Sequence, residues 1–237
     1  MVDITVSPEN HLFQYVENKF LVSNETLIFC RRDATEVTIP RYIKRIGTYA
    51  FSKIEVNSIT FEDNSSLERI EECAFKIRKN IDNLIFPPSM KFADNYSLNL
   101  QNTNSIVFLG EDIKLNSCFF TCRNLYLKFP NAKKLSYSGF SIDDIKFYVK
   151  KGIQLEGDIV TKFLSNVVFV DENDNSKWNE MPNPAVKTTN ITSSPNNKPN
   201  KNNIPISTKQ FKIEFQQNIF KSNFNQTFLN QIPTKQF

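Results

Sequence analysis

The sequence has little of the residue types on which metal binding and catalysis usually depend. Its 237 residues include one histidine and five glycines. A structural zinc site needs four nitrogen or sulfur ligands close together, and a phosphate-binding loop needs closely spaced glycines. No Gly-x-Ser-x-Gly sequence or neighbouring Cys and His supplies a nucleophile. We therefore expect no metal, no cofactor and no enzymatic activity. Acid–base catalysis by carboxylates that meet only in space stays open at this point.

Long apolar runs are also absent. No stretch reaches the 18 or so apolar residues of a membrane span, and residues 1–13 lack the basic and hydrophobic regions of a secretory signal. We therefore predict a cytoplasmic protein without a transmembrane segment, and a secreted or cell-surface location is the alternative. The four cysteines are expected to be buried thiols in a reducing compartment. The sequons at Asn24, Asn64, Asn95, Asn190 and Asn225 would matter only in an exported chain.

Neither charge sign dominates the sequence. The 29 basic and 25 acidic side chains leave a formal net charge of +4. Nucleic-acid binders usually show a strong basic excess or dense basic clusters. Nucleic acid is therefore not an expected partner.

One pattern recurs along the middle of the chain: a polar residue followed by an apolar-x-apolar triplet. The triplets begin at residues 37, 59, 84, 106, 125, 145 and 167, so six intervals cover 130 residues, or about 22 residues each. Self-similarity at such a period is typical of stacked repeat units. We predict a β-rich solenoid of short parallel strands joined by turns or short helical segments. The strands near 125 and 145 could also begin two residues later, which would keep the same side chains inward.

Alternation within the triplets predicts which side chains form the core. One strand-plus-turn unit cannot bury its own apolar face, so neighbouring units stack and share a core. Successive strand residues point to opposite faces. The inward residues are then Val37, Ile39, Ile59, Phe61, Leu84, Phe86, Ile106 and Phe108. A second internal column is predicted from Phe51, Phe75, Leu98, Phe120, Phe140 and Phe163.

Residues 37–61, VTIPRYIKRIGTYAFSKIEVNSITF, show a more specific pattern. An apolar-x-apolar-Pro strand is followed by Ile-Gly at 46–47 and Ala-Phe at 50–51, and the next unit repeats Ala-Phe at 74–75. This pattern resembles the BspA-like, or Treponema pallidum-type, leucine-rich repeat, and the apolar skeleton continues to about residue 170. The resemblance implies a leucine-rich-repeat solenoid that binds proteins. Members of this family are often surface-associated or adhesive.

The two ends of the chain differ from the repeats. Residues 1–36 contain short apolar runs separated by turn-forming sequences, and we predict an N-terminal cap there. The solenoid is expected over residues 37–175. Residues 176–237 are rich in Asn, Lys and Pro and are predicted to be a disordered tail. Within it, Phe recurs at helical spacing over 207–232, so an amphipathic helix is a second interpretation of that segment.

The outward middle residues of the triplets predict one row across the strands: Thr38, Thr60, Ile85, Val107, Tyr126, Lys146 and Val168. A polar row is expected on one side, at Ser58, Asn83, Ser105, Asn124, Asp144 and Asn166, and Lys128 and Tyr148 on the other. An apolar strip with a polar rim is typical of a protein-binding surface. The candidate contact residues are Ile85, Val107, Tyr126, Lys146 and Tyr148. The alternative is that these residues only reflect strand propensity.

The sequence thus favours a non-enzymatic scaffold that presents a β-ladder to a protein partner, with no small-molecule substrate. The second hypothesis is a cell-surface or secreted adhesin that binds host or matrix proteins. A third hypothesis assigns RNA or membrane binding to the tail, from residue 176 onward.

Overall fold

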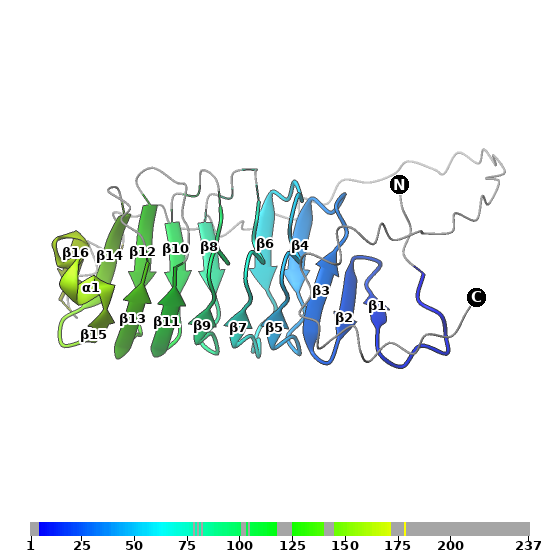
Figure 1. The fold of residues 1–237 in the computed structure, drawn as a ribbon, viewed down its shortest axis with the longest axis horizontal. Coiled ribbons are helices and arrows are strands. Elements are labelled where there is room, and N and C mark those ends of the chain that lie inside the picture. Colours follow the sequence, from blue (N-terminus) through cyan, green and yellow to red (C-terminus); the bar gives the residue numbers. More distant parts are fainter. Residues whose placement is uncertain are drawn as a thin grey trace, which may run out of the picture. The chain divides into compact units, whose positions relative to one another are not determined.

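The computed structural model describes residues 5–171, except 78, 80, 82, 101, 102, 104, 118–124 and 140–144, and it also describes residue 178. All of these residues belong to one compact unit, Met1–Thr188. Apart from Trp178, the predicted tail and its possible helix over 207–232 lie outside the described residues. In the unit, short strands lie in two rows along the stack of coils (Figure 1).

The lower row in Figure 1 is a nine-stranded sheet. In sheet order it contains β1 (Gln14–Val16), β2 (Phe20–Ser23), β3 (Thr26–Cys30), β5 (Arg45–Ile46), β7 (Arg69–Ile70), β9 (Phe92–Ala93), β11 (Asp112–Asn116), β13 (Lys134–Ser138) and β15 (Gln154–Gly157). From β3 onward all neighbouring strands are parallel. Parallel neighbours separated by one coil are the expected result of stacked repeats.

The upper row in Figure 1 consists of two shorter sheets. The first pairs β4 (Glu36–Ile39) with β6 (Ser58–Phe61). The second contains β8 (Asn83–Phe86), β10 (Ser105–Phe108), β12 (Leu125–Phe129), β14 (Ile145–Lys150) and β16 (Val167–Val170), in that order and all parallel. The described helices are one turn of α1 (Asp158–Thr161) and the 3-10 helix η1 (Leu164–Asn166).

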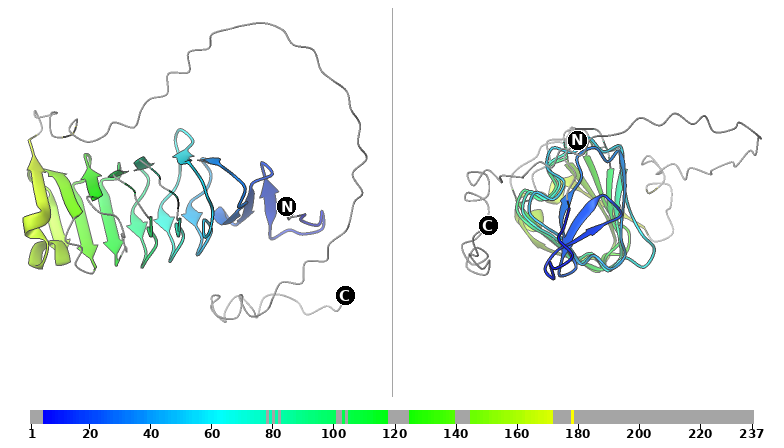
Figure 2. Two further views of the ribbon diagram at one scale, coloured as in Figure 1. Left: turned by 90° about the horizontal axis from the view of Figure 1, so that it is seen from above. Right: turned by 90° about the vertical axis from the view of Figure 1, so that its right-hand side faces the viewer.

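The predicted alternation sets the burial of the strands. Of the eight residues expected to face inward, seven are buried, and Phe61 is partly buried against the same core. The second apolar group of each coil lies on the opposite sheet, where Ile46, Ile70 and Ala93 are fully buried. Side chains from both sheets therefore meet inside the coil, which the view along the stack shows as a closed outline (Figure 2). The β-solenoid predicted from the sequence is confirmed.

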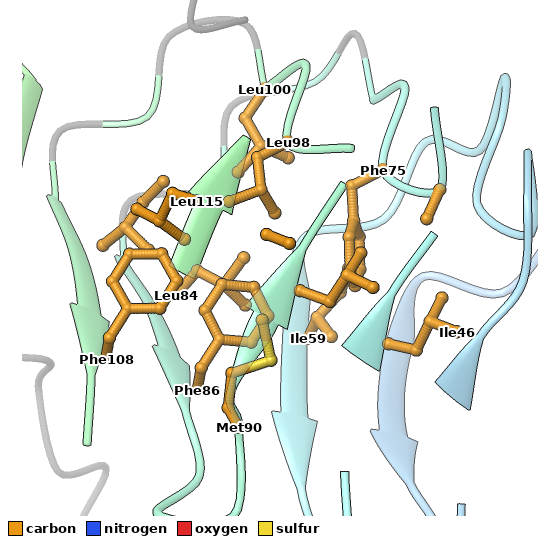
Figure 3. Packing of buried hydrophobic residues seen from close by; sticks show 14 of the residues in the cluster. Ile46, Ile59, Phe75, Leu84, Phe86, Met90, Leu98, Leu100, Phe108 and Leu115 are labelled. Carbon is orange, nitrogen blue, oxygen red and sulfur yellow. The ribbon is translucent and has the colours of Figure 1, made fainter. Parts of the chain in front are cut away.

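Phenylalanine rings form a column through this core, and Figure 3 shows Phe75, Phe86 and Phe108 inside the coils. The rings of Phe51 and Phe75 stack at 4.9 Å, those of Phe86 and Phe108 at 5.1 Å, and those of Phe108 and Phe129 at 5.1 Å. Phe75 and Phe86 meet edge to face at 6.1 Å and join the two parts. The predicted column begins at Phe51 and Phe75, but from Phe86 onward the stacked rings come from the strands. Phe120 and Phe140 lie outside the described residues.

The first strands of the chain pair differently from the repeats. β1, β2 and β3 are antiparallel neighbours. The turns between them contain Asn18 and Asn24 at φ values of 52° and 46°, in the left-handed region that Asn adopts more readily than most residues. β3 then pairs in parallel with β5. β3 therefore already belongs to the parallel stack. The boundary of an N-terminal cap at residue 36 stays a prediction.

Candidate functional site

The solvent side of the five-stranded sheet carries the residues singled out from the sequence. We define the outer face as the outward positions of this sheet, which are Asn83, Ile85, Ser105, Val107, Tyr126, Lys128, Lys146, Tyr148, Lys150, Val168 and Val170. The buried positions between them, such as Leu127 and Phe147, point into the core. The strand alternation therefore separates core from outer face as the sequence predicts.

The register of the strands corrects the predicted row. Ile85 pairs with Val107, but Val107 pairs with Lys128 and not with Tyr126. One row is therefore Ile85, Val107, Lys128, Tyr148 and Val168, and a second is Asn83, Ser105, Tyr126 and Lys146. The prediction of a single row through Val107 and Tyr126 was wrong by two residues. The reason is that Leu127 aligns with Ile106 and Phe147 aligns with Val167, two residues after the predicted triplet starts at 125 and 145. A shift of two residues does not change which side chains face outward.

The five candidate contact residues differ in exposure. Ile85, Val107 and Tyr126 are half-buried, and Lys146 is exposed. Tyr148, which was expected on a flank of the row, lies within the row next to Lys128 and is only 9 % exposed. Thr38 and Thr60 are exposed, but they belong to the separate β4–β6 pair, where their hydroxyl oxygens lie 3.0 Å apart. Asn124 and Asp144 of the predicted polar row lie outside the described residues. The open apolar part of the outer face is thus around Ile85, Val107 and Tyr126.

A tryptophan from beyond the last strand covers the other part. Trp178 packs against a small cluster made of Tyr148 and Val170, together with Tyr126 and Val168. The rings of Tyr126 and Tyr148 meet edge to face at 5.8 Å. Val170 is fully buried although it points outward from the last strand of the sheet. Such a position is open to solvent unless another segment covers it, and Trp178 is a described residue that does so.

The charge of the outer face is of one sign. Its positions include Lys128, Lys146 and Lys150 and no Asp or Glu. Lys128 is 6 % exposed, and burial lowers the pKa of its ammonium group because a charged amine loses hydration there. In the described part of the chain, the nearby ion pairs are Lys151–Asp171 and Lys162–Asp158. Neither pair involves the three lysines of the outer face.

The nine-stranded sheet has a different surface. There, cations and carboxylates of neighbouring coils form ion pairs, as in Lys91–Glu68 at 3.0 Å and Lys133–Glu111 at 2.7 Å. Exposed pairs of this kind contribute little to stability, but they neutralise the surface on which they lie. The outer face therefore stands out by its unpaired lysines and its aromatic and aliphatic side chains.

The described residues provide a surface suited to recognition. They contain no group of three or more His, Cys, Asp or Glu side chains that could hold a metal ion. The one histidine of the chain, His11, is exposed before β1. Burial raises the pKa of the Cys30 thiol to about 12, so this cysteine stays protonated at neutral pH. No described helix is long and apolar enough to cross a membrane.

Two features of the face were missed from the sequence alone. Lys128 was placed on a flank although it lies between Val107 and Tyr148 in the central row. Trp178 was assigned to the disordered tail, although it packs on the sheet. A signal existed for the second feature, because a single tryptophan in a polar segment is a large apolar surface that is usually at least partly buried.

The geometry defines the class of this protein: it is a β-solenoid repeat protein with stacked parallel coils. Comparison with family models gives the family. Six copies of the BspA-type leucine-rich repeat match residues 24–146, which is slightly more than half of the chain. The chain therefore belongs to the BspA-type leucine-rich repeat family, as the resemblance had indicated. Leucine-rich repeats generally mediate protein–protein interactions. Comparisons with curated proteins and with solved structures gave no match.

Proposed function

We propose that this protein is a non-enzymatic scaffold that binds a protein partner through the outer face of its five-stranded sheet. The observation that carries the proposal is the combination of half-buried apolar side chains at Ile85, Val107 and Tyr126 with lysines that have no described carboxylate partner. Exposed apolar surface next to polar residues is typical of binding sites. A face made only for stability would bury these side chains or pair the charges.

The test compares capture of partners by full-length protein and by two variants. Val107→Asp places a carboxylate in the middle of the open apolar part, where it disrupts apolar contacts and pairs with Lys128. Thr38→Asp makes the same change of charge at an exposed strand position of the separate β4–β6 pair. Both variants must keep the circular dichroism spectrum and a urea midpoint close to that of the unmodified protein.

The proposal expects a partner, isolated from the cells of origin with immobilised protein, to be lost with Val107→Asp and kept with Thr38→Asp. A Tyr126→Ala and Val107→Asp double variant should lose the same partner. Equal capture by all folded variants would place the binding surface elsewhere and reject the proposal.

A cell-surface or secreted adhesin is a second form of the same function, with the partner outside the cell. The sequons at Asn24, Asn64 and Asn95 offer a test, because these three asparagines are exposed. An exported chain in a eukaryotic host should therefore carry glycan at these sequons. The intact mass of the native protein, before and after glycosidase treatment, distinguishes the adhesin from the intracellular scaffold.

A further inference from the structure

The outer face is too small to hold a folded domain by itself. Five strands about 4.8 Å apart span about 19 Å, and the outward residues of one strand cover about 13 Å along it, which gives roughly 250 Å². A standard interface between folded proteins buries about 800 Å² on each side. A short peptide segment of about six extended residues spans 19 Å. The dimensions therefore favour a linear segment as the ligand of this face.

The chemistry of the face defines what that segment should contain. Lys146 is exposed and Lys150 is half-buried, and the described positions of the face contain no Asp or Glu, so the face favours an acidic ligand. Tyr126, Tyr148 and the aliphatic residues favour an apolar or aromatic side chain. An aromatic ring that packs on these tyrosines gains contact area at a small cost in side-chain entropy. Exposed ion pairs add at most about fivefold each to affinity, so the aromatic side chain is the anchor and the carboxylates set orientation and preference.

The chain itself carries a segment with this composition. Residues 171–181, DENDNSKWNEM, contain four carboxylates, one lysine and the only tryptophan of the protein. At the start of this segment, Asp171 forms a 2.6 Å ion pair with Lys151. Seven residues later, Trp178 packs against the cluster of Tyr148 and Val170, against which Tyr126 and Val168 also pack. One end of the outer face is thus occupied by an aromatic side chain from an acidic segment.

From these observations we infer that the outer face recognises short acidic peptide segments with an aromatic anchor, and that Trp178 occupies the anchor position in the free protein. The inference rests on the proposed function and adds both the class of ligand and its regulation. A partner segment that presents its own aromatic residue competes with Trp178 for Tyr126 and Tyr148. The open part around Ile85 and Val107 is accessible to the partner before Trp178 leaves.

The length of the tether sets the size of this competition. A tether of about seven residues typically gives a local concentration of about 1 mM. Trp178 occupies the face most of the time only if the isolated segment binds with a dissociation constant below about 1 mM. If that constant is about 100 µM, the tether weakens binding of an external segment by about tenfold.

The test uses full-length protein and a fluorescein-labelled synthetic peptide of residues 171–181. By fluorescence anisotropy, the peptide should bind the Trp178→Ala variant with a dissociation constant below about 1 mM and bind the unmodified protein several-fold more weakly. A peptide with Asn or Gln in place of its carboxylates should bind the variant more weakly. Adding Lys146→Glu and Lys150→Glu to Trp178→Ala should weaken binding by about tenfold or more, whereas Lys114→Glu, an exposed position on the nine-stranded sheet, should leave it unchanged.

A second measurement needs no variant of the protein. Trp178 is the only tryptophan, so its emission in unmodified protein reports its own environment. An unlabelled peptide with Phe in place of Trp should shift this emission to longer wavelength in a saturable manner as Trp178 is displaced into water.

Absence of peptide binding up to 1 mM, or equal binding by Trp178→Ala and unmodified protein, would overturn the inference. This failure differs from failure of the proposed function. If the peptide does not bind while Val107→Asp still loses a partner that Thr38→Asp keeps, the face is a binding surface for another kind of ligand. If Val107→Asp keeps every partner, the proposed function fails and the inference fails with it.

Discussion

The phenylalanine column gives a stability prediction whose size follows from the structure. Phe75 is fully buried, stacks on Phe51 at 4.9 Å and meets Phe86 edge to face at 6.1 Å. Replacing a buried Phe by Ala costs about 3 to 5 kcal/mol because of lost apolar burial and the cavity left behind. Each aromatic pair adds about 0.5 to 1.5 kcal/mol to what burial alone gives. Since Phe75→Ala removes two pairs, we expect a cost in the upper part of that range, about 4 to 5 kcal/mol.

Urea unfolding measures this cost. With a slope of about 2 kcal/mol per molar urea, the midpoint should fall by about 2 M. Phe169→Ala is the matched control, because Phe169 is 41 % exposed on the last strand and should change stability by less than about 1 kcal/mol. Repeat proteins can unfold in parts, so circular dichroism and Trp178 emission should be followed together. A cost below about 1.5 kcal/mol for Phe75→Ala, or an equal cost for Phe169→Ala, would refute the stacked column.

Three further predictions concern single positions. Burial lowers the pKa of Lys128, so between its folded and unfolded values the unfolded chain binds more protons and stability rises with pH. Lys128→Met should therefore raise the urea midpoint at pH 7, and the gain should shrink towards pH 10.5, the ordinary pKa of lysine; a lower midpoint would contradict this. Gly157 has φ of 76° and a Cβ there would lie 2.5 Å from the Tyr137 carbonyl oxygen, whereas Gly152 at φ 85° has open space. Gly157→Ala should thus lower the melting temperature clearly more than Gly152→Ala, which carries backbone strain of about 1 kcal/mol alone, and equal effects would reject the close contact. Finally, burial raises the pKa of the Cys30 thiol to about 12, so this thiol should resist iodoacetamide at pH 8 in native protein and react in urea. Peptide mass mapping measures the labelling, and rapid labelling of native protein would show that the N-terminal core is open.

The fold could be predicted because one physical requirement repeats in every coil. Each coil must present apolar side chains at alternate strand positions, and this leaves the triplets that begin at Val37, Ile59 and Leu84 visible in the sequence. The Ala-Phe pairs at 50–51 and 74–75 add a pattern specific enough to identify the family. The internal positions of the first coils were therefore predicted correctly.

The register of the later coils was predicted less well, because the apolar pattern of β12 fits two alignments. In β12, residues 125–127 and 127–129 both have the form apolar-x-apolar, so the triplet alone fits two registers. In the structure Ile106, Leu127, Phe147 and Val167 are aligned. These positions are spaced by 21, 20 and 20 residues, whereas the predicted start at 125 gave an interval of only 19. Even spacing of the repeats would have selected the correct register.

The candidate site could be predicted only in part, because its cover comes from outside the repeats. Periodicity identified Ile85, Val107 and Tyr126 as outward residues, but it contains no information on a segment that follows the last strand. Composition alone assigned Trp178 to a disordered tail, since its neighbours are polar. The packing of one aromatic side chain on Tyr148 and Val170 depends on shape, which no pattern within residues 171–181 specifies. The binding role of the five candidate residues stays a prediction.

The most direct test of the outer face as the binding surface is the emission of Trp178 in full-length protein during titration with a purified partner. Displacement of Trp178 should shift its emission to longer wavelength, with a midpoint equal to the dissociation constant measured independently. The Val107→Asp variant should show neither binding nor shift. A partner that binds unmodified protein and Val107→Asp with equal affinity, while Trp178 emission stays constant, would show that it uses another surface and would contradict the assignment of the outer face.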